Sequence, residues 1–438
     1  MEDQISESVF EKHAAEAYAR FSQAAGKYHF TFRRSAVTCG AKPCMVFLGN
    51  HSSGKSSIIN WLLGENVQDT GLAPTDDGFT FIVYGEKRDD FHGQAALGRL
   101  PPEFAGLKAF GDTFVHGLRV KFRPIAFLKT VTFVDSPGMI DSAEETVGRD
   151  YDFEGVVRTL AELCDMVFYL FDPDKPGTTG ETVNIFAKCL SGVKFKLRIL
   201  LNKCDGFSSL YDFARTYGTL CWNLAGVLQT KDMPKIWTVY SGETRENAPG
   251  SLDLSDFNRH RDEFVAVFHD AAARRRDNIV SQTNSDFLGL SIRMRILDLV
   301  WRRCFACSAA VWLAAASAAA AVSRAVYAGN AAGGAFVSVA AAACAGLLAL
   351  GAGFLAARLA SSFVRTRLAN RIDDVFRREY RGRIETGTHD DLFKTWDDIR
   401  EETVKIVRSL PLRLPFFGEL LRWRLEKTRK RLDAASRR

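Results

Sequence analysis

The sequence predicts an α/β fold with a mainly parallel sheet, accompanied by a helical region that contains a hydrophobic hairpin. Three observations predict it: a strand that leads into a glycine-rich loop at residues 43–57, later strands that alternate with helical stretches, and two uncharged runs within residues 304–357. With 438 residues and 47% hydrophobic content, the chain is long enough for one large or two to three ordinary domains, which excludes a disordered protein.

The first element is residues 43–57, PCMVFLGNHSSGKSS, in which the apolar strand Cys44–Leu48 leads into the pattern GxxxxGK[ST]. Glycines at the fixed positions let backbone N–H groups turn toward phosphates, the lysine supplies a mobile positive charge, and the serine hydroxyl can ligate Mg²⁺. A helix over Ser57–Leu63, ended by Gly64, would point its positive end at the same anion. We therefore predict a nucleotide-binding loop made of Gly49, Asn50, His51, Ser52, Ser53, Gly54, Lys55, Ser56 and Ser57.

The next element is residues 71–80, GLAPTDDGFT, which we expect to close over Mg²⁺ and the γ-phosphate as switch segments do. Thr75 is the candidate residue and Thr80 the reserve, although a solvated loop has the same composition. A strand over Thr130–Asp135 then delivers the sequence DSPG, in which the carboxylate can hold Mg²⁺ through water and the glycine N–H can bind the γ-phosphate. The predicted metal site is Ser56, Thr75 and Asp135, and the predicted catalytic residues are Lys55, Thr75, Gly138 and His51.

Three further strands, at residues 166–171, 197–201 and 235–240, alternate with helical stretches such as residues 155–163. This βα repeat predicts a parallel sheet covered on both faces. The second of these strands ends in NKCD, an NKxD sequence: Asp205 can accept two N–H groups of a guanine edge, Asn202 can brace the loop, and the stem of Lys203 can lie against the base. Ser241, after the last strand, completes the predicted nucleotide-binding set. The motifs, in this order and each at a strand end, predict a P-loop GTPase-like fold.

Charge and cysteine content limit the function classes. The formal net charge is +6, and residues 411–438 hold nine Lys/Arg against three Asp/Glu, so the basic excess belongs to this tail. The segment 414–438 reads as a basic amphipathic helix for anionic lipid, or as a solvated terminus. Nine cysteines without metal-ligand spacing indicate reduced thiols in the cytosol, and the polar start predicts no signal peptide. We expect no nucleic-acid partner, because no base-reading module is present.

The second informative stretch is residues 304–357. Residues 304–323 and 335–357 carry no charge, Arg324 lies between them, and a short turn is expected over residues 326–334. Each run is long enough to cross a hydrocarbon layer as a helix. Arginines flank the pair on both sides, which predicts a two-helix, multi-pass hairpin with both termini in the cytosol. The alternatives are a shallow membrane wedge and a buried helix pair in a soluble protein.

Several motifs carry a family resemblance. The runs RDYDF (149–153), LAELCD (160–165), FDPDK (171–175), RILLNKCD (198–205) and YGTLCW (217–222) resemble the dynamin-related EH-domain ATPases and their relative sarcalumenin, over residues 10 to 245. This resemblance implies a dynamin-type G domain, a helical domain built from the N-terminal helix and later helices, nucleotide-dependent dimers and oligomers, and membrane shaping. It also implies ATP as the nucleotide, whereas the NKxD chemistry predicts GTP.

Two features depart from that pattern. His51 stands where dynamins carry a glutamine that orients the attacking water, so we expect slow hydrolysis. No EF-hand loop of the type D-x-[DN]-x-[DN]-G occurs, so we expect the EH domain to be absent.

The expected organisation has five parts. They are an N-terminal amphipathic helix (1–35), the G domain (36–245), the first part of a helical domain (246–303), the hairpin (304–357) and the second part of the helical domain (358–438). The expected function is that of a membrane-anchored dynamin-superfamily GTPase that uses Mg²⁺ and controls self-assembly and membrane remodelling or trafficking. A non-hydrolysing membrane scaffold and a soluble switch GTPase are the alternatives. The expected partners are the bilayer and further copies of the chain, and endosomal or endoplasmic reticulum membranes would suit it.

Overall fold

The computed structural model describes residues 2–32, 41–69, 78–139, 150–174, 182, 185, 189–228, 235–242, 253–329, 335–382, 390–409 and 418–436. It forms two compact units. Unit 1 comprises Met1–Ala15, Arg33–Ser281 and Ala435–Arg438, and unit 2 comprises Glu16–Phe32 and Gln282–Ala434. Helices α1, α9 and α14 contribute residues to both units.

Unit 1 contains the sheet, whose strands are β1 (Cys44–Gly49), β2 (Thr80–Tyr84), β3 (Asp89–His92), β4 (Arg119–Arg123), β5 (Thr132–Asp135), β6 (Met166–Phe171), β7 (Leu197–Leu201) and β8 (Ile236–Thr238). The α-helices of this region are α2 (Lys55–Leu63), α3 (Gly93–Leu97), α4 (Asp112–Gly117), α5 (Phe153–Leu163), α7 (Leu210–Leu228) and α8 (Ser255–His269). Short 3-10 helices are η1 (Pro102–Phe110), η2 (Ala126–Lys129), η5 (Ser191–Lys196) and η6 (Cys204–Gly206).

The strand order in the sheet is β3-β4-β2-β5-β1-β6-β7-β8. The pairs β5–β1, β1–β6, β6–β7 and β7–β8 are parallel, as is β2–β4, whereas β2–β5 and β3–β4 are antiparallel. The carboxyl ends of β1, β5, β6, β7 and β8 therefore meet at one edge of the sheet, which is where ligands bind in open α/β sheets.

Alternate side chains of each strand enter different hydrophobic cores, as the two-residue period of a strand requires. On one face, Val46 and Leu48 of β1 pack in a core with Val156 of α5 and Leu220 of α7. On the other face, Phe47 belongs to a second core, which holds Ile58 and Ile59 of α2 and Phe264 and Phe268 of α8. The ring of Phe47 stacks on Phe168 of β6 with centroids 5.1 Å apart. Both faces are thus covered by helices, which fixes the strand ends in place.

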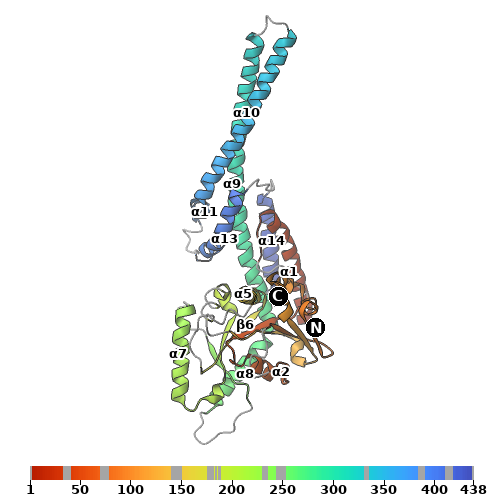
Figure 1. The fold of residues 1–438 in the computed structure, drawn as a ribbon, viewed down its shortest axis with the longest axis vertical. Coiled ribbons are helices and arrows are strands. Elements are labelled where there is room, and N and C mark those ends of the chain that lie inside the picture. The colour runs from red at the N-terminus through yellow and green to blue at the C-terminus, as the bar shows by residue number, and fades with distance from the viewer. Residues whose placement is uncertain are drawn as a thin grey trace. The chain divides into compact units, whose positions relative to one another are not determined.

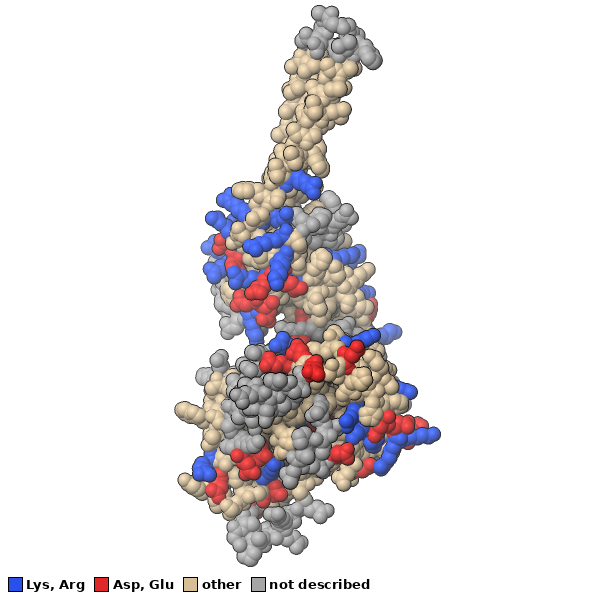
Figure 2. Space-filling model, in the orientation of Figure 1, with Lys and Arg blue, Asp and Glu red and all other residues tan. Residues whose placement is uncertain are grey.

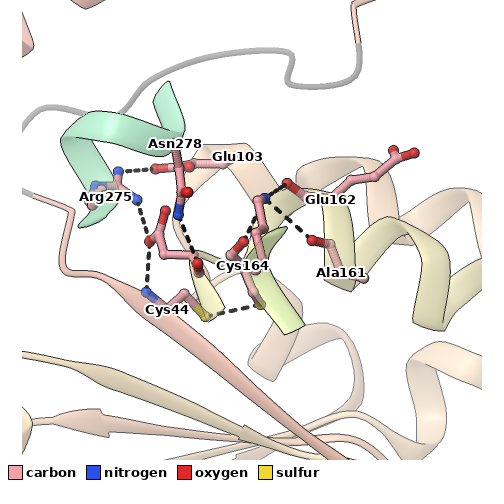
Figure 3. A network of polar contacts seen from close by, with 9 residues as sticks. Cys44, Glu103, Ala161, Glu162, Cys164, Arg275 and Asn278 are labelled. Carbon is pink, nitrogen blue, oxygen red and sulfur yellow. Dashed lines mark hydrogen bonds and ion pairs between the residues drawn. The ribbon is translucent and has the colours of Figure 1, made fainter. Parts of the chain in front are cut away.

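A buried polar network holds the amino ends of β1 and β6 to the start of α9 (Ala271–Gly329) (Figure 3). Arg275 forms ion pairs with Glu103 at 3.0 Å and Asp165 at 3.2 Å, and all three side chains are at most 6% exposed. The same Asp165 carboxylate accepts a hydrogen bond from the Cys44 backbone N–H at 3.0 Å. Asn278 donates to the Asp165 carbonyl at 2.7 Å. The first turns of α9 are therefore part of unit 1.

Unit 2 is a helical bundle. Its elements are the second half of α1 (Glu2–Lys27), most of α9, α10 (Ala335–Asn370), α11 (Ile372–Glu379), α13 (Asp390–Arg408) and α14 (Gly418–Ser436). Phe21 of α1 packs against Phe287 of α9 with ring centroids 5.7 Å apart, and the Tyr28 hydroxyl donates to Asp298 of α9 at 3.1 Å. The N-terminal helix α1 thus packs against α9.

Within unit 2, the end of α9 and the start of α10 form an antiparallel hairpin (Figure 1). The Ser323 hydroxyl donates to the Ala342 carbonyl at 3.0 Å, and the Trp312 and Phe354 rings lie 6.0 Å apart. Close contact depends on small residues, because a Cβ added at Gly353 would lie 2.3 Å from the Ala315 Cβ. Figure 2 shows the visible face of the hairpin without charge and Lys and Arg gathered at its base.

The fold confirms the predicted α/β class with a mainly parallel sheet and corrects several details. The strands predicted at residues 166–171 and 197–201 are found at those bounds, and Gly64 ends α2 in the left-handed conformation. Strands β2, β3 and β4 were not predicted. Residues 326–329 are helical and belong to α9, where a turn was expected. Helix α8 lies in the segment 246–303 that the sequence assigns to the helical domain, but it packs on the sheet.

Candidate nucleotide-binding site

The loop between β1 and α2 has a backbone that only glycine tolerates at its critical point. Gly54 has φ +84°, and a Cβ placed there would lie 2.2 Å from Asn202 Nδ2. A Cβ at Gly49 would lie 2.5 Å from the Leu170 carbonyl oxygen. The loop therefore lies in close contact with Leu170 of β6 and with Asn202, which follows β7, and glycine at these two positions permits that close approach.

Lys55 fills the centre of this loop. Its side chain is 6% exposed, and its ammonium donates hydrogen bonds to the Gly49 and Asn50 carbonyls, each at 3.0 Å. These contacts hold the positive charge inside the loop at the amino end of α2, where the helix dipole adds to it. The arrangement presents concentrated positive potential to an anion.

Ser56 and Asp135 meet beside Lys55. The Ser56 hydroxyl donates to Asp135 Oδ2 at 2.7 Å, and Gln68 Nε2 donates to the same oxygen at 2.8 Å. Burial raises the pKa of the Asp135 carboxyl, and the nearby Lys55 charge opposes that rise. Asp135 is only 4% exposed.

This corner fits a magnesium ion. Asp135 Oδ1 and Ser53 Oγ are buried and have no hydrogen-bond partner among the described residues. A buried carboxylate oxygen without a partner is costly unless a cation or water reaches it. Together with the Ser56 hydroxyl, these oxygens match the small set of hard donors that Mg²⁺ takes from a protein when phosphates supply the rest.

The segment after Asp135 lies directly against the phosphate loop. The His51 N–H donates to the Met139 carbonyl at 3.0 Å, and the Met139 N–H donates to the Gly49 carbonyl at 3.1 Å. A Cβ at Gly138 would lie 2.7 Å from the His51 Cα. The predicted sensor glycine is thus packed on the loop whose phosphate it would sense.

The NKxD residues directly follow β7, and the Cys204 N–H donates to the Val239 carbonyl, next to the end of β8, at 3.2 Å. Asn202 Nδ2 donates to the Ser53 carbonyl at 2.9 Å and so ties this motif to the phosphate loop. Lys203 has φ +56° and forms an ion pair with Asp172 at 2.6 Å. Asp205 lies against the loop after β8, since a Cβ at Gly242, next to Ser241, would lie 3.2 Å from Asp205 Oδ2. The predicted base-binding residues therefore come together.

Thr75 and Thr80 were the two candidates for the switch threonine. Thr75 lies outside the described residues. Thr80, its reserve, opens strand β2 opposite Asp135 and is buried, so it belongs to the sheet and not to a switch loop. The His51 ring contacts the Ser52 hydroxyl, with Nδ1 and Oγ 2.8 Å apart. Among the described residues, the hydrogen-bond partner of His51 Nδ1 is therefore the neighbouring Ser52.

Three residues contribute to the site without having been predicted. Gln68 holds Asp135, and Asn60 fixes Gln68 by accepting its N–H at 2.9 Å and donating to its carbonyl at 2.8 Å. Asp172 anchors Lys203. Asp172 could have been found, because it directly follows a buried parallel strand. No sequence pattern marks Asn60 or Gln68.

The fold and this pocket define a P-loop GTPase domain. The family model described as 50S ribosome-binding GTPase (MMR_HSR1) matches residues 44–203. Over its G-domain region the chain is homologous to EH domain-containing proteins. It is 31% identical over 249 residues to EH domain-containing protein 1 of Arabidopsis thaliana, which covers 55% of this chain and 45% of that protein. It is 32% identical over 203 residues to EH domain-containing protein 2 of Homo sapiens, which covers 46% and 36%.

Among solved structures, a chain of an oligomerised bacterial dynamin pair aligns over 100% of this chain and 79% of its own length, with 14% identity and a TM-score of 0.39. Toc33 from Arabidopsis thaliana, solved with GDP and Mg²⁺, covers 60% and 95%, with 12% identity and a TM-score of 0.31. The chain spans less than half the length of the curated relatives that it matches.

Proposed function

We propose that this chain is a membrane-anchored nucleoside triphosphatase of the dynamin superfamily, whose nucleotide state controls self-assembly and membrane remodelling. The observation that carries the proposal is the convergence of Lys55, Asp135, Gly138 and Asn202 at the carboxyl edge of one parallel sheet. Phosphate, metal and base chemistry are thereby offered within a single pocket.

Each residue has a proposed role. Lys55 exchanges its loop carbonyls for the β- and γ-phosphates, and the Ser56 hydroxyl and the Asp135 carboxylate hold the metal position, the latter through water. Mg²⁺, when bound, neutralises charge on the phosphates. Gly138 senses the γ-phosphate, and Thr75 closes over it. Asp205 selects the base, with Lys203 and Ser241 beside it, and both GTP and ATP remain in the proposal.

The membrane anchor is proposed from the hairpin. Helices spanning Ala271–Ala328 and Val339–Asn370 contain windows of mean hydropathy 1.8 and 2.1, of which only 6% and 11% are buried. A helix in the core of a soluble protein would be mostly buried, whereas Leu347 and Leu348 are 69% and 76% exposed. The uncharged run 304–323 is about 30 Å long as a helix, which matches the hydrocarbon thickness. With arginines at both outer ends, both termini face the cytosol.

Self-association is proposed from α7. This helix packs on the sheet through Leu220 and Leu224, while Tyr211 and Trp222 are 75% and 82% exposed. These two aromatics are about three helical turns apart and share one face. A large exposed aromatic pair on a G domain is typical of an interaction surface, and a second copy of the chain is the partner that we propose.

Competitive binding of GTP and ATP to the full chain in lipid nanodiscs tests the nucleotide proposal. We expect Mg²⁺-dependent binding of at least one of them, and Lys55→Ala should abolish it. Phosphate release measured with and without added liposomes then tests turnover. Retained affinity in Lys55→Ala would contradict the assignment of the site.

A non-hydrolysing membrane scaffold is the second candidate. His51, which stands where dynamins carry a water-positioning glutamine, favours this candidate, because its ring contacts the neighbouring Ser52 hydroxyl. Tight nucleotide binding without phosphate release, in the presence and absence of liposomes, would support it. Alkaline carbonate extraction separates both candidates from a soluble GTPase, which alone would appear in the supernatant.

A further inference from the structure

Four arginines gather in one pocket of unit 2, where the hairpin begins. The pocket has a volume of about 230 Å³ and is lined by Arg303, Arg367, Arg371 and Arg378, together with Asp374 and Glu379. Arg303 directly precedes the uncharged run that begins at Cys304. The pocket therefore lies at the level where the chain changes from charged to uncharged.

Residues of three helices line this pocket. Arg371, Asp374 and Arg378 follow one another at spacings of three and four residues, so they share one face at α11. Helix α9 supplies Arg303 and α10 supplies Arg367. The convergence of guanidinium groups is thus a property of the bundle and not of one basic stretch.

Charge pairing distinguishes these arginines from their neighbours. Close to the pocket, Arg295 pairs with Glu379 at 3.2 Å, Arg302 with Glu419 at 3.1 Å, and Arg400 with Asp373 at 2.8 Å. In contrast, none of the four pocket guanidinium groups forms an ion pair with a carboxylate in the described part of the chain. Since Glu379 is already paired, Asp374 alone opposes four positive charges, and the pocket carries a net positive potential.

Helix α11, which carries Arg378 and has Arg371 as its N-cap residue, is held firmly. The Phe376 ring stacks on Trp396 of α13 with centroids 4.7 Å apart and planes 6° from parallel. The Trp396 indole N–H donates to Asp373 at 3.0 Å. Positions on α11 are therefore fixed before any ligand arrives, which lowers the ordering cost of binding.

We infer that this pocket binds the phosphate group of an anionic phospholipid. Arginine is suited to phosphate because its planar guanidinium offers paired N–H donors. The volume is below the about 300–1,000 Å³ of pockets for drug-sized ligands, so it suits a headgroup fragment better than a whole nucleotide. Each headgroup layer extends roughly 5–7 Å beyond the hydrocarbon, and Arg303 directly precedes the run that would cross it. This inference rests on the membrane anchor proposed above.

The test uses the full chain in detergent micelles, with dioctanoyl phosphatidic acid, dioctanoyl phosphatidylcholine and inorganic phosphate as probes in native mass spectrometry. The pocket variant is Arg371→Gln/Arg378→Gln. The control, Arg302→Gln/Arg400→Gln, removes the same charge from paired arginines outside the pocket. We expect the wild type and the control to bind phosphatidic acid alike, and the pocket variant to bind it at least tenfold more weakly.

Three results would overturn the inference: equal loss in both variants, equal affinity for phosphatidylcholine, or inorganic phosphate binding as tightly as phosphatidic acid, which would indicate a soluble anion as the ligand. GTP and ATP affinity and carbonate extraction are measured on the same variants and should not change. A failure of the lipid pocket is thereby distinguished from a failure of the nucleotide site or of the anchor.

Discussion

Replacing Gly54 by alanine isolates the contact between the phosphate loop and the NKxD strand. The new Cβ would lie 2.2 Å from Asn202 Nδ2, which already donates to the Ser53 carbonyl at 2.9 Å. Relieving the clash means breaking this buried hydrogen bond, at about 1–3 kcal/mol. The left-handed backbone adds about 1–2 kcal/mol for any residue with a Cβ. The variant should therefore be destabilised by roughly 2–5 kcal/mol.

Gly64 provides a matched control. It has φ +65°, but a Cβ there meets no atom within 4 Å. Gly64→Ala should lose only the backbone contribution, about 1–2 kcal/mol, and keep its nucleotide affinity. Titration with fluorescent GTP and ATP, alongside thermal melting, measures both effects. The clash displaces the phosphate loop itself, so we expect Gly54→Ala to bind nucleotide about tenfold or more weakly, a loss that corresponds to about 1.4 kcal/mol of binding free energy. Equal affinities of the two variants would refute the reasoning.

Three further predictions follow from buried charges and exposed rings. Asp135→Asn should weaken Mg²⁺-dependent nucleotide binding about 10–100-fold in titrations. Burial raises the pKa of Asp135, so the native state retains a proton there that the unfolded chain has lost. In the absence of metal, the free energy of unfolding of the wild type should therefore fall as pH rises through that raised pKa. The free energy of unfolding of Asp135→Asn should not show this fall. Arg275→Met should cost about 3–5 kcal/mol in denaturant unfolding, because it removes the guanidinium that pairs with both buried carboxylates, Glu103 and Asp165, and neutralising both carboxylates should restore part of that loss. Trp222→Glu should abolish nucleotide-dependent self-association in sedimentation without changing nucleotide affinity, and unchanged sedimentation would disprove the α7 interface.

The strands that sequence reasoning found are those buried on both faces. Strands β6 and β7 are near-continuous apolar runs, and such runs are typical of the centre of a parallel sheet. Strand β4, with the sequence RVKFR, reads as a charged surface segment, yet Lys121 is buried and donates to the Val67 carbonyl at 2.9 Å. A pattern of charges gives no sign that a lysine will find a buried carbonyl far along the chain. Strand β3, at the edge of the sheet, is mostly exposed and polar, so it lacks a hydrophobic signal.

The same distinction applies to the site. Lys55, Asp135 and Asn202 were predicted because fixed spacings and strand ends bring them to one edge of the sheet. The support of that site depends on side-chain contacts between loops. Gln68 reaches Asp135 only because Asn60 holds its backbone at both N–H and carbonyl. Such contacts depend on packing and leave no periodic trace in the sequence.

The two halves of the proposed function make separable demands on the chain. The nucleotide pocket is built from residues of unit 1, and the hairpin with its arginine pocket is built from residues of unit 2. No residue is shared between the two sets, so Lys55→Ala should remain in carbonate-washed membranes, and Arg371→Gln/Arg378→Gln should still bind nucleotide. A chain in which nucleotide state controls membrane shape must then show a third behaviour, lipid-dependent phosphate release, which each of these variants loses for a different reason. Helix α9 contributes Arg275 to one unit and Arg303 to the other. A substitution in α9 that abolishes lipid-dependent phosphate release, but keeps nucleotide binding and membrane attachment intact, would locate the link between the two units in this helix.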